Sequence, residues 1–253
     1  MTTIPVLSID GLQVHDRLSV NQLQFYPGQL VHILGSNGAG KSTLLSCAAG
    51  LDADFHQHVL LRNKALSEWT LSQLAQERCL LEQGVVCQFE ISVREVLNFY
   101  GVTTDIPLQL AVPLELEGLL HRSITQLSGG ELQRVHIARC LLQIWTSISR
   151  GEALILFDEP MQGLDVKHQL AVMDFLTALV AQGNCVIMSC HDLQLTARYA
   201  TDCVMLEDGK VAASGAKSTV LTAANLSHCF GCEFNLIYSE NAYQFYLPRL
   251  SHS

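Results

Sequence analysis

A glycine-rich segment constrains the fold of this chain more than any other feature. The apolar run Leu30 to Leu34 comes directly before it, and residues typical of a helix follow it. It fits the pattern G-x-x-x-x-G-K-[ST], and its residues are Gly35, Ser36, Asn37, Gly38, Ala39, Gly40, Lys41, Ser42 and Thr43. A loop of this kind between a strand and a helix predicts an α/β fold with a phosphate-binding loop. The alternative is a glycine turn without a ligand.

The residue types in this loop suit phosphate chemistry. Glycines let the backbone wrap closely around phosphate oxygens, and the N-terminus of the following helix adds positive partial charge. Lys41 is expected to hold the β- and γ-phosphates of a nucleotide. Ser42 would offer its hydroxyl to Mg²⁺, and Thr43 would add a further phosphate contact. The loop therefore predicts a nucleoside triphosphate and Mg²⁺ as ligands.

A pair of carboxylates follows the apolar run Ala153 to Phe157. Open α/β sheets bind their ligands at the carboxyl ends of the strands, which is where Asp158 and Glu159 are expected to lie. Asp158 can bind Mg²⁺ or orient its water shell, and Glu159 can polarise a water for attack on the γ-phosphorus. A strand that ends in two acids is also common on protein surfaces, so this pair needs support from other residues.

That support comes from Leu127-Ser-Gly-Gly-Glu131, which precedes a segment with apolar residues at helical spacing. Ser128 can cap the helix, and the exposed amides of Gly129 and Gly130 can meet phosphate at the positive end of the helix dipole. A second anion site is therefore expected here. Taken alone, Ser-Gly-Gly is an ordinary loop.

The order of the expected elements predicts one continuous domain, residues 1–253, with a doubly wound sheet. Short apolar stretches from Ile4 to Phe25 favour antiparallel strands near the N-terminus, and Val186 to Ser189 resembles a second central strand. An amphipathic helix is expected after Asp165. The stretch from about 87 to 142 has mostly helical periodicity and is assigned as a helical subdomain.

The composition excludes several classes of protein. Acidic residues exceed basic residues, 24 against 15, which argues against a nucleic-acid partner, because such proteins present a concentrated basic face. The apolar runs are far shorter than the roughly 20 residues that a membrane-spanning helix needs. The start MTTIPVLSID does not resemble a secretory signal, so a cytoplasmic chain is expected. Hydrophobic residues make up 49%, which favours a surface buried against a partner.

Cysteine is unusually common, with nine residues in the chain. Their scattered apolar contexts indicate reduced thiols that pack as small hydrophobes. Cys229 and Cys232 form a C-x-x-C pair, but no second pair at zinc spacing accompanies it. Metal binding or redox chemistry at this pair is the alternative.

Taken together, the loop at 35–43, the Ser-Gly-Gly segment, the Asp-Glu pair and a downstream His191 resemble the ATP-binding cassette family over nearly the whole chain. The resemblance implies a P-loop NTPase fold with a RecA-like core, an N-terminal antiparallel β region and a helical subdomain. It also implies that two cassettes sandwich two ATP molecules, with Mg²⁺, between the loop of one and the signature Leu127–Glu131 of the other. A single cassette then implies a homodimer.

The resemblance assigns roles to three further residues. Gln83 matches the glutamine that reaches Mg²⁺ and the attacking water and reports the nucleotide state to the partner. Asp165, in Leu164-Asp165, matches the aspartate that organises the facing site across the dimer. His191 matches the histidine that contacts the γ-phosphate. Without the resemblance, Gln83 would be an exposed loop amide and His191 an ordinary residue at a strand end.

Two departures from the family pattern stand out. The signature ends in Glu131 where glutamine is usual, which should be tolerated because Ser128 and the glycine amides make the phosphate contacts. The aromatic residue that usually stacks on adenine is absent, since no Phe, Tyr or Trp lies between Met1 and Gln24. His15 or Arg17 could cover the base instead, and either could be a solvated loop residue.

The resemblance is strongest to cassettes that energise import of iron-siderophores, haem and vitamin B12. Within that group, Glu159–Val166 and Gln126–Arg134 favour the vitamin B12 cassettes, with haem or siderophore as the alternative. This reading implies two membrane-spanning permease subunits, a periplasmic substrate-binding protein that acts indirectly, and a position on the cytoplasmic face of the bacterial inner membrane. A soluble cassette of the iron-sulfur assembly type is the competing hypothesis. The stretch from Lys41 to Leu127 is too short for the long arms of DNA-repair cassettes, and a fused translation-type cassette would need a second phosphate loop.

Overall fold

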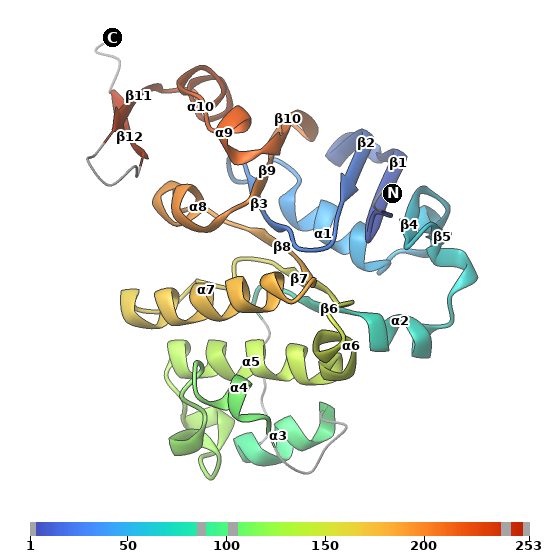
Figure 1. Cartoon of the computed structure of the whole chain (residues 1–253), viewed down its shortest axis with the longest axis vertical. Helices are drawn as coiled ribbons and strands as arrows, with labels where there is room; N and C mark the ends of the chain where they lie inside the picture. Colours follow the sequence, from blue (N-terminus) through green and yellow to red (C-terminus); the bar gives the residue numbers. More distant parts are fainter. Residues whose placement is uncertain (1–3, 85–89, 101–105, 239–243, 250–253) are drawn as a thin grey trace.

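The computed structural model describes residues 4–84, 90–100, 106–238 and 244–249. A ten-stranded sheet runs through the molecule in the order β5-β4-β1-β2-β10-β9-β3-β8-β7-β6 (Figure 1). Its parallel part consists of β9 (Asp202–Glu207), β3 (Leu30–Leu34), β8 (Cys185–Ser189), β7 (Leu154–Phe157) and β6 (Arg78–Leu81). The runs before the glycine loop and before Asp158 thus form the central strands that their apolar sequences predict.

The N-terminal part of the sheet is antiparallel, as the sequence predicts. It consists of β1 (Leu7–Val14), β2 (Leu18–Phe25), β4 (Val59–Leu61) and β5 (Lys64–Ala65). Strand β10 (Lys210–Ala216) lies between the two parts, antiparallel to β9 and parallel to β2. The pairing of β10 with β2 has a single register pair, Lys210 with Ser19, so the two parts meet at a narrow seam.

Alternate residues of the central strands enter two separate hydrophobic cores, because successive side chains of a strand point to opposite faces. Leu154 and Leu156 pack in one core with residues of α1 (Lys41–Ala49). Ile155 and Phe157 pack in the other core with residues of α5 (Gly129–Gln143) and α7 (Val166–Ala181). Helices therefore cover both faces of the parallel strands, which confirms the doubly wound arrangement.

Helices dominate the region below the sheet in Figure 1. Besides α5 and α7 these are α3 (Val93–Tyr100), α4 (Leu108–Ala111) and α6 (Trp145–Ser149). Cys87, near the start of the predicted helical subdomain, lies outside the described residues. The fold class is confirmed: an α/β sheet with an antiparallel N-terminal part and a helical region.

The other elements are α2 (Leu71–Glu77), α8 (Leu193–Tyr199), α9 (Lys217–Val220), α10 (Ala223–Phe230), β11 (Glu233–Tyr238) and β12 (Gln244–Arg249). The last two strands form a separate hairpin near the C-terminus (Figure 1). Helix α7 begins directly after Asp165, as predicted, and its first residue, Val166, is 70% exposed. In the described part of the chain, no helix has both the length and the apolar character needed to span a bilayer.

Candidate functional site

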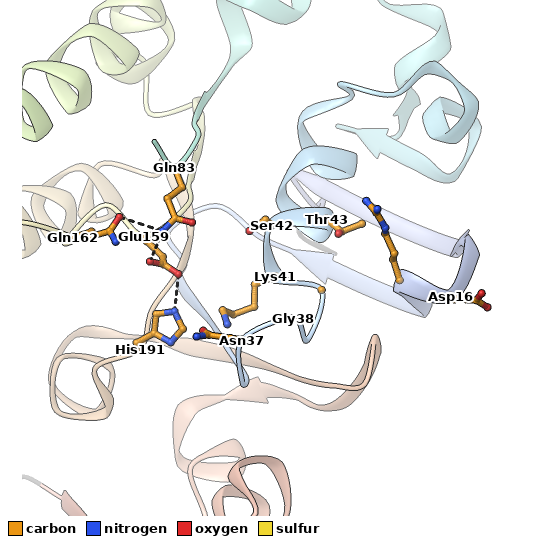
Figure 2. Close-up of a pocket in the computed structure, with 12 residues that line it drawn as sticks. Asp16, Asn37, Gly38, Lys41, Ser42, Thr43, Gln83, Glu159, Gln162 and His191 are labelled. Carbon is orange, nitrogen blue, oxygen red and sulfur yellow. Dashed lines mark hydrogen bonds and ion pairs between the residues drawn. The ribbon is translucent and has the colours of Figure 1, made fainter. Parts of the chain in front are cut away.

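A cavity of about 760 Å³ opens beside the start of α1 and the loops that follow the parallel strands (Figure 2). The glycine loop and α1 contribute Asn37, Gly38, Gly40, Lys41, Ser42 and Thr43 to its wall. The loops after β6, β7 and β8 contribute Gln83, Glu159 and His191. Residues that are distant in the sequence, and that were singled out separately, therefore meet in one cavity.

Glycine is required at several positions of the loop by backbone geometry. Gly35 has φ of +149°, and a Cβ there would lie 2.4 Å from the carbonyl oxygen of Leu206. Gly40 has φ of +100° and precedes α1 without capping it by a side chain. A Cβ on Gly38 would meet nothing within 4 Å, so this backbone faces open space. The first amides of α1 are thus left to an external anion.

Lys41 is held by the loop itself. Its Nζ donates to the carbonyl oxygens of Gly35 at 2.8 Å and Ser36 at 2.9 Å. Burial lowers the pKa of this amine, while the nearby carboxylates of Glu159 and Asp158 act in the opposite direction. The cation is therefore preorganised within the cavity wall. Ala39 is buried and does not line the cavity.

The two carboxylates after β7 are positioned by one hydroxyl, that of Ser189 at the end of β8. Ser189 Oγ donates to Asp158 Oδ1 at 2.6 Å and accepts from the backbone N–H of Glu159 at 2.7 Å. Asp158 is buried and does not line the cavity, whereas Glu159 lines it. Glu159 also has φ of +48°, a left-handed conformation that is costly outside glycine and that persists where the surroundings impose it. The sequence predicted a strand that ends at Ser189, but it did not predict this role of the Ser189 hydroxyl.

Glu159 is the centre of a hydrogen-bond network in the cavity (Figure 2). His191 Nε2 donates to Glu159 Oε1 at 2.7 Å, and Gln83 Nε2 donates to Glu159 Oε2 at 3.1 Å. Gln83 Nε2 also lies 3.2 Å from Oε1 of Gln162, a second residue that sequence reasoning missed. Side chains from two other loops thus fix the orientation of one carboxylate, as a general base requires.

Of the two candidates for covering the base, only one lines this cavity. Arg17 and its neighbour Asp16 line both this cavity and an adjacent one of about 530 Å³, whereas His15 lines the adjacent cavity and not this one. The backbone of Arg17 is tightly enclosed, since its carbonyl oxygen lies 3.0 Å from the position of a Cβ on Gly40 and 2.6 Å from that of a Cβ on Gly209. The place of Arg17 beside the glycine loop is therefore set by backbone packing.

The signature loop lies outside the cavity. Ser128 caps α5 as predicted, since its Oγ accepts from the Glu131 N–H at 3.3 Å while Glu131 Oε2 accepts from the Ser128 N–H at 2.8 Å. Glu131 also pairs with Arg122 at 2.6 Å. The hydrogen bond from the Ser128 backbone, followed by that from Arg122, lowers the pKa of Glu131 to about 2. Gly129 and Gly130 form the first turn of the helix.

Asp165 also lies outside the cavity, where it caps α7. Its Oδ1 accepts from the His168 N–H at 2.9 Å, and its side chain is 65% exposed. The loop before it touches the signature, because a Cβ on Gly130 would lie 2.8 Å from the Gly163 carbonyl oxygen. Asp165 and the signature are thus neighbours on a surface apart from the cavity.

The predicted Mg²⁺ ligands are all oxygen donors, which is the ligand type that Mg²⁺ prefers. Ser42 and Gln83 line the cavity, whereas Asp158 is buried and does not line it. Within the described residues there is no group of three or more His, Cys, Asp or Glu side chains placed to hold a metal ion. At the C-x-x-C pair, Cys229 is buried with its Sγ 3.4 Å from the Leu206 carbonyl oxygen, and burial raises the pKa of its thiol.

Comparison with known proteins gives the family. Residues 18–162, more than half of the chain, match the family model described as "ABC transporter". The chain belongs to the ABC transporter family. As a family member it binds ATP with Mg²⁺ and carries the fold of an ATP-hydrolysing subunit, which confirms the predicted nucleotide and metal ion.

Two curated relatives of this ABC protein are equally similar to it. The hemin import ATP-binding protein HmuV of Hahella chejuensis is 37% identical over 232 residues, which cover 88% of this chain and 91% of the relative. The vitamin B12 import ATP-binding protein BtuD of Escherichia coli is 37% identical over 232 residues, which cover 90% and 93%. A solved metal-chelate type ABC transporter in an inward-facing conformation shares the fold, with a TM-score of 0.76, 22% identity and 98% coverage of both chains.

Proposed function

We propose that this ABC protein hydrolyses ATP as one of two identical cassettes in an importer, docked under two permease subunits at the cytoplasmic face of the bacterial inner membrane. The observation that carries the proposal is the division of the candidate residues. Lys41, Glu159 and His191 share one cavity, whereas Ser128 and Asp165 lie on another surface. A second copy would bring its signature to that cavity and complete the site.

Within one site, each residue has a chemical task. Lys41 and the first amides of α1 bind the β- and γ-phosphates, with Thr43 as a further phosphate contact. Ser42, Asp158 and Gln83 hold Mg²⁺, which neutralises charge on the phosphates when bound. Glu159 accepts a proton from the attacking water, and His191 orients this carboxylate and contacts the γ-phosphate.

For the adenine base we propose Arg17 rather than His15, because Arg17 lines the same cavity as the phosphate loop. A guanidinium can stack on a base in place of the missing aromatic side chain. Replacing Arg17 by Ala should weaken ATP binding severalfold with little effect on tripolyphosphate, whereas His15→Ala should alter neither. Equal effects of the two variants would refute this assignment.

For the permease we propose a surface on the helical region, which we place at about 87–142 of a single domain spanning 1–253. Its basis is a groove of about 540 Å³ beside α4, where Leu108 and Val112 are exposed. Phe99, at the end of α3, is 90% exposed. Exposed apolar side chains gathered on one region mark an interaction surface.

Vitamin B12 is the substrate we propose, delivered to the permease by a periplasmic binding protein that does not touch this chain. Its basis is the signature and Asp-Glu segments, together with the similarity to a vitamin B12 import protein. The equal similarity to a hemin import protein makes haem the second candidate. A deletion strain should fail to grow on limiting cobalamin. Normal growth there, with a defect on haem or a siderophore, would assign the substrate to the second group.

Co-purification distinguishes an importer subunit from a soluble cassette. The tagged chain, isolated from detergent-solubilised membranes, is expected to bring down a membrane-spanning partner in equal amounts. Recovery of the chain alone from the soluble fraction, with ATPase activity intact, would favour the soluble cassette of the iron-sulfur assembly type.

A further inference from the structure

Glu115 lies where three elements of the helical region meet, away from the cavity. Its backbone has φ of +47°, which is uncommon for a residue other than glycine, and its N–H donates to the Val112 carbonyl oxygen at 3.1 Å. Leu114 and Leu116 on either side are fully buried. The backbone is therefore fixed, and it persists in a strained conformation that often marks a functional residue.

The carboxylate of Glu115 contacts two helices at once. On α7 it accepts from Lys167 Nζ at 2.7 Å and from His168 Nε2 at 3.3 Å. On α5 it lies 3.8 Å from a terminal nitrogen of Arg134, whose side chain is only 7% exposed. Lys167 and then His168 hold the pKa of Glu115 below its usual range, so the side chain is an anion at neutral pH.

His168 extends this junction to Asp165. Its Nε2 faces Glu115, while its Nδ1 lies 2.8 Å from Asp165 Oδ1. The imidazole is thus placed between the two carboxylates and is largely buried, with 18% of its side chain exposed. Displacement of Glu115 would remove the contact at Nε2 of His168, whose Nδ1 orients Asp165.

Arg134 extends the junction to the signature, because α5 begins within the signature at Gly129 and includes Arg134. That helix is also attached to the loop before Asp165, where Gln133 Nε2 donates to the Pro160 carbonyl oxygen at 3.0 Å. Close to it, the backbones of Gly130 and Gly163 are in contact. The signature and Asp165 are therefore connected in two ways. The backbones of Gly130 and Gly163 pack against each other, and the charged groups of Arg134, Glu115 and His168 form a second connection.

We propose that Glu115 is a positioning residue that holds the signature and Asp165 in one arrangement, through Arg134 and His168, so that both reach a nucleotide bound by the partner copy together. This inference rests on the proposed pairing of two cassettes. It assigns to Glu115 a task in forming the paired site and none in nucleotide binding by its own chain.

The test uses full-length chains that carry Glu159→Gln, so that ATP is bound but not consumed. Two quantities are measured: nucleotide affinity of the dilute chain by fluorescence, and ATP-dependent dimerisation by sedimentation. The test variants are Glu115→Gln, which keeps the size of the side chain, and His168→Ala, which leaves the contact between Glu115 and Arg134. Lys167→Ala is the matched control, since Lys167 pairs with Glu115 but is 74% exposed.

Both test variants are expected to weaken ATP-dependent dimerisation roughly tenfold, within the usual range of coupling between sites. Their nucleotide affinity as dilute chains should stay unchanged. The control should alter dimerisation about twofold or less, because exposed ion pairs contribute little. The double variant Glu115→Gln/His168→Ala should be no worse than the stronger single variant, because the two residues act in one network.

Dimerisation of both test variants as tight as that of the control would overturn the proposal. So would a parallel loss of nucleotide affinity, which would indicate damage to the variant's own cavity. If Glu115→Gln fails to fold, as judged by thermal unfolding, His168→Ala decides the question. Failure of the Glu159→Gln parent to dimerise with ATP would instead refute the pairing of cassettes, and the inference with it.

Discussion

Two helices begin in opposite ways in this molecule. Helix α1 starts after Gly40 with no side-chain cap, so its first amides remain available to a ligand. Helix α5 starts after Ser128 with a capping box, and Glu131 adds a carboxylate that Arg122 holds in place. The same physical device, the positive end of a helix dipole, is thus left open at one site and stabilised by the chain's own groups at the other. The N-terminus of α1 can therefore bind an anion within its own chain, whereas the N-terminus of α5 is stabilised by its own chain before any partner binds. We call these two helix starts the open site and the closed site.

The largest expected effect lies at the open site. Glu159→Gln should reduce ATP hydrolysis on the order of 10²- to 10⁴-fold, because it removes the general base while keeping the side-chain shape. ATP binding should be preserved, since Lys41 and the α1 amides are untouched. Steady-state phosphate release and equilibrium nucleotide binding check the two statements. Hydrolysis near the normal rate would contradict the assignment of Glu159.

Substitution at each helix start tests the comparison directly. Lys41→Ala should weaken nucleotide binding by the dilute chain on the order of 10- to 100-fold, the usual value for loss of charged hydrogen bonds. Ser128→Ala should leave that binding unchanged but abolish ATP-dependent dimerisation, at a cost of about 1 kcal/mol in stability from the lost cap. Nucleotide titration and sedimentation on both variants provide the measurement. Weakened binding by dilute Ser128→Ala would show that the second helix acts within its own chain.

A histidine on β3, the strand that leads to the open site, should cause most of the loss of stability at mildly acidic pH. His32 on β3 is fully buried, and this burial lowers its pKa from 6.5 to about 3. Because the unfolded chain takes up a proton that the folded chain refuses, the contribution of His32 is complete above pH 6.5. It falls between pH 6.5 and 3, by up to about 1.4 kcal/mol per pH unit.

His32→Leu should flatten that pH dependence, as measured by urea unfolding at several pH values. The substitution leaves no broken network, since the Thr196 hydroxyl that accepts from His32 still donates to the Asp192 carbonyl oxygen. If the free energy of unfolding of the variant depended on pH between 6.5 and 4.5 as strongly as that of the unmodified chain, groups other than His32 would be responsible for the acid sensitivity.

At the closed site, Glu131 should make the smallest contribution to the free energy of unfolding, and this contribution should be lost at a lower pH than that of His32. Glu131 has a pKa of about 2 in the folded chain against an ordinary value of 4.5, so its contribution is complete above pH 4.5 and declines as the pH falls toward 2. Glu131→Gln keeps a side-chain acceptor for the Ser128 N–H and loses only the pair with Arg122. The expected cost at pH 7 is below about 1 kcal/mol. A larger loss in urea unfolding would indicate that the pair with Arg122 holds the signature in place.

Local patterns predicted the parts of the fold whose signals are contained in one segment. The glycine loop between β3 and α1 and the apolar strands β7 and β8 are examples. Strand β6 was missed because it is an edge strand of mixed composition that starts at Arg78 and follows directly after a helix. The β9–β10 hairpin was missed although its turn carries a known signal, since Asp208 and Gly209 both have positive φ as an Asp-Gly hairpin turn requires.

The candidate site divides in the same way. Lys41, Asp158 and Ser128 were found because each belongs to a motif or an element boundary. Ser189 was missed because its task depends on the neighbouring strand β7, and nothing in its own segment records that contact. Choosing Arg17 over His15 also required the folded chain, since the two residues occupy one short 3-10 turn and only their packing separates them.

The seam between β2 and β10 gives bound nucleotide a further consequence. Across it, the Ser19 N–H donates to the Gly209 carbonyl oxygen, next to the register pair of Ser19 with Lys210. Arg17 lies on the antiparallel side of the seam and Lys41 on the parallel side. A nucleotide that contacts both residues, as proposed, would link the antiparallel and parallel parts of the sheet and stabilise the contact between them. Amide hydrogen exchange at Ser19 should therefore slow when ATP binds, which makes this single amide a reporter of occupancy.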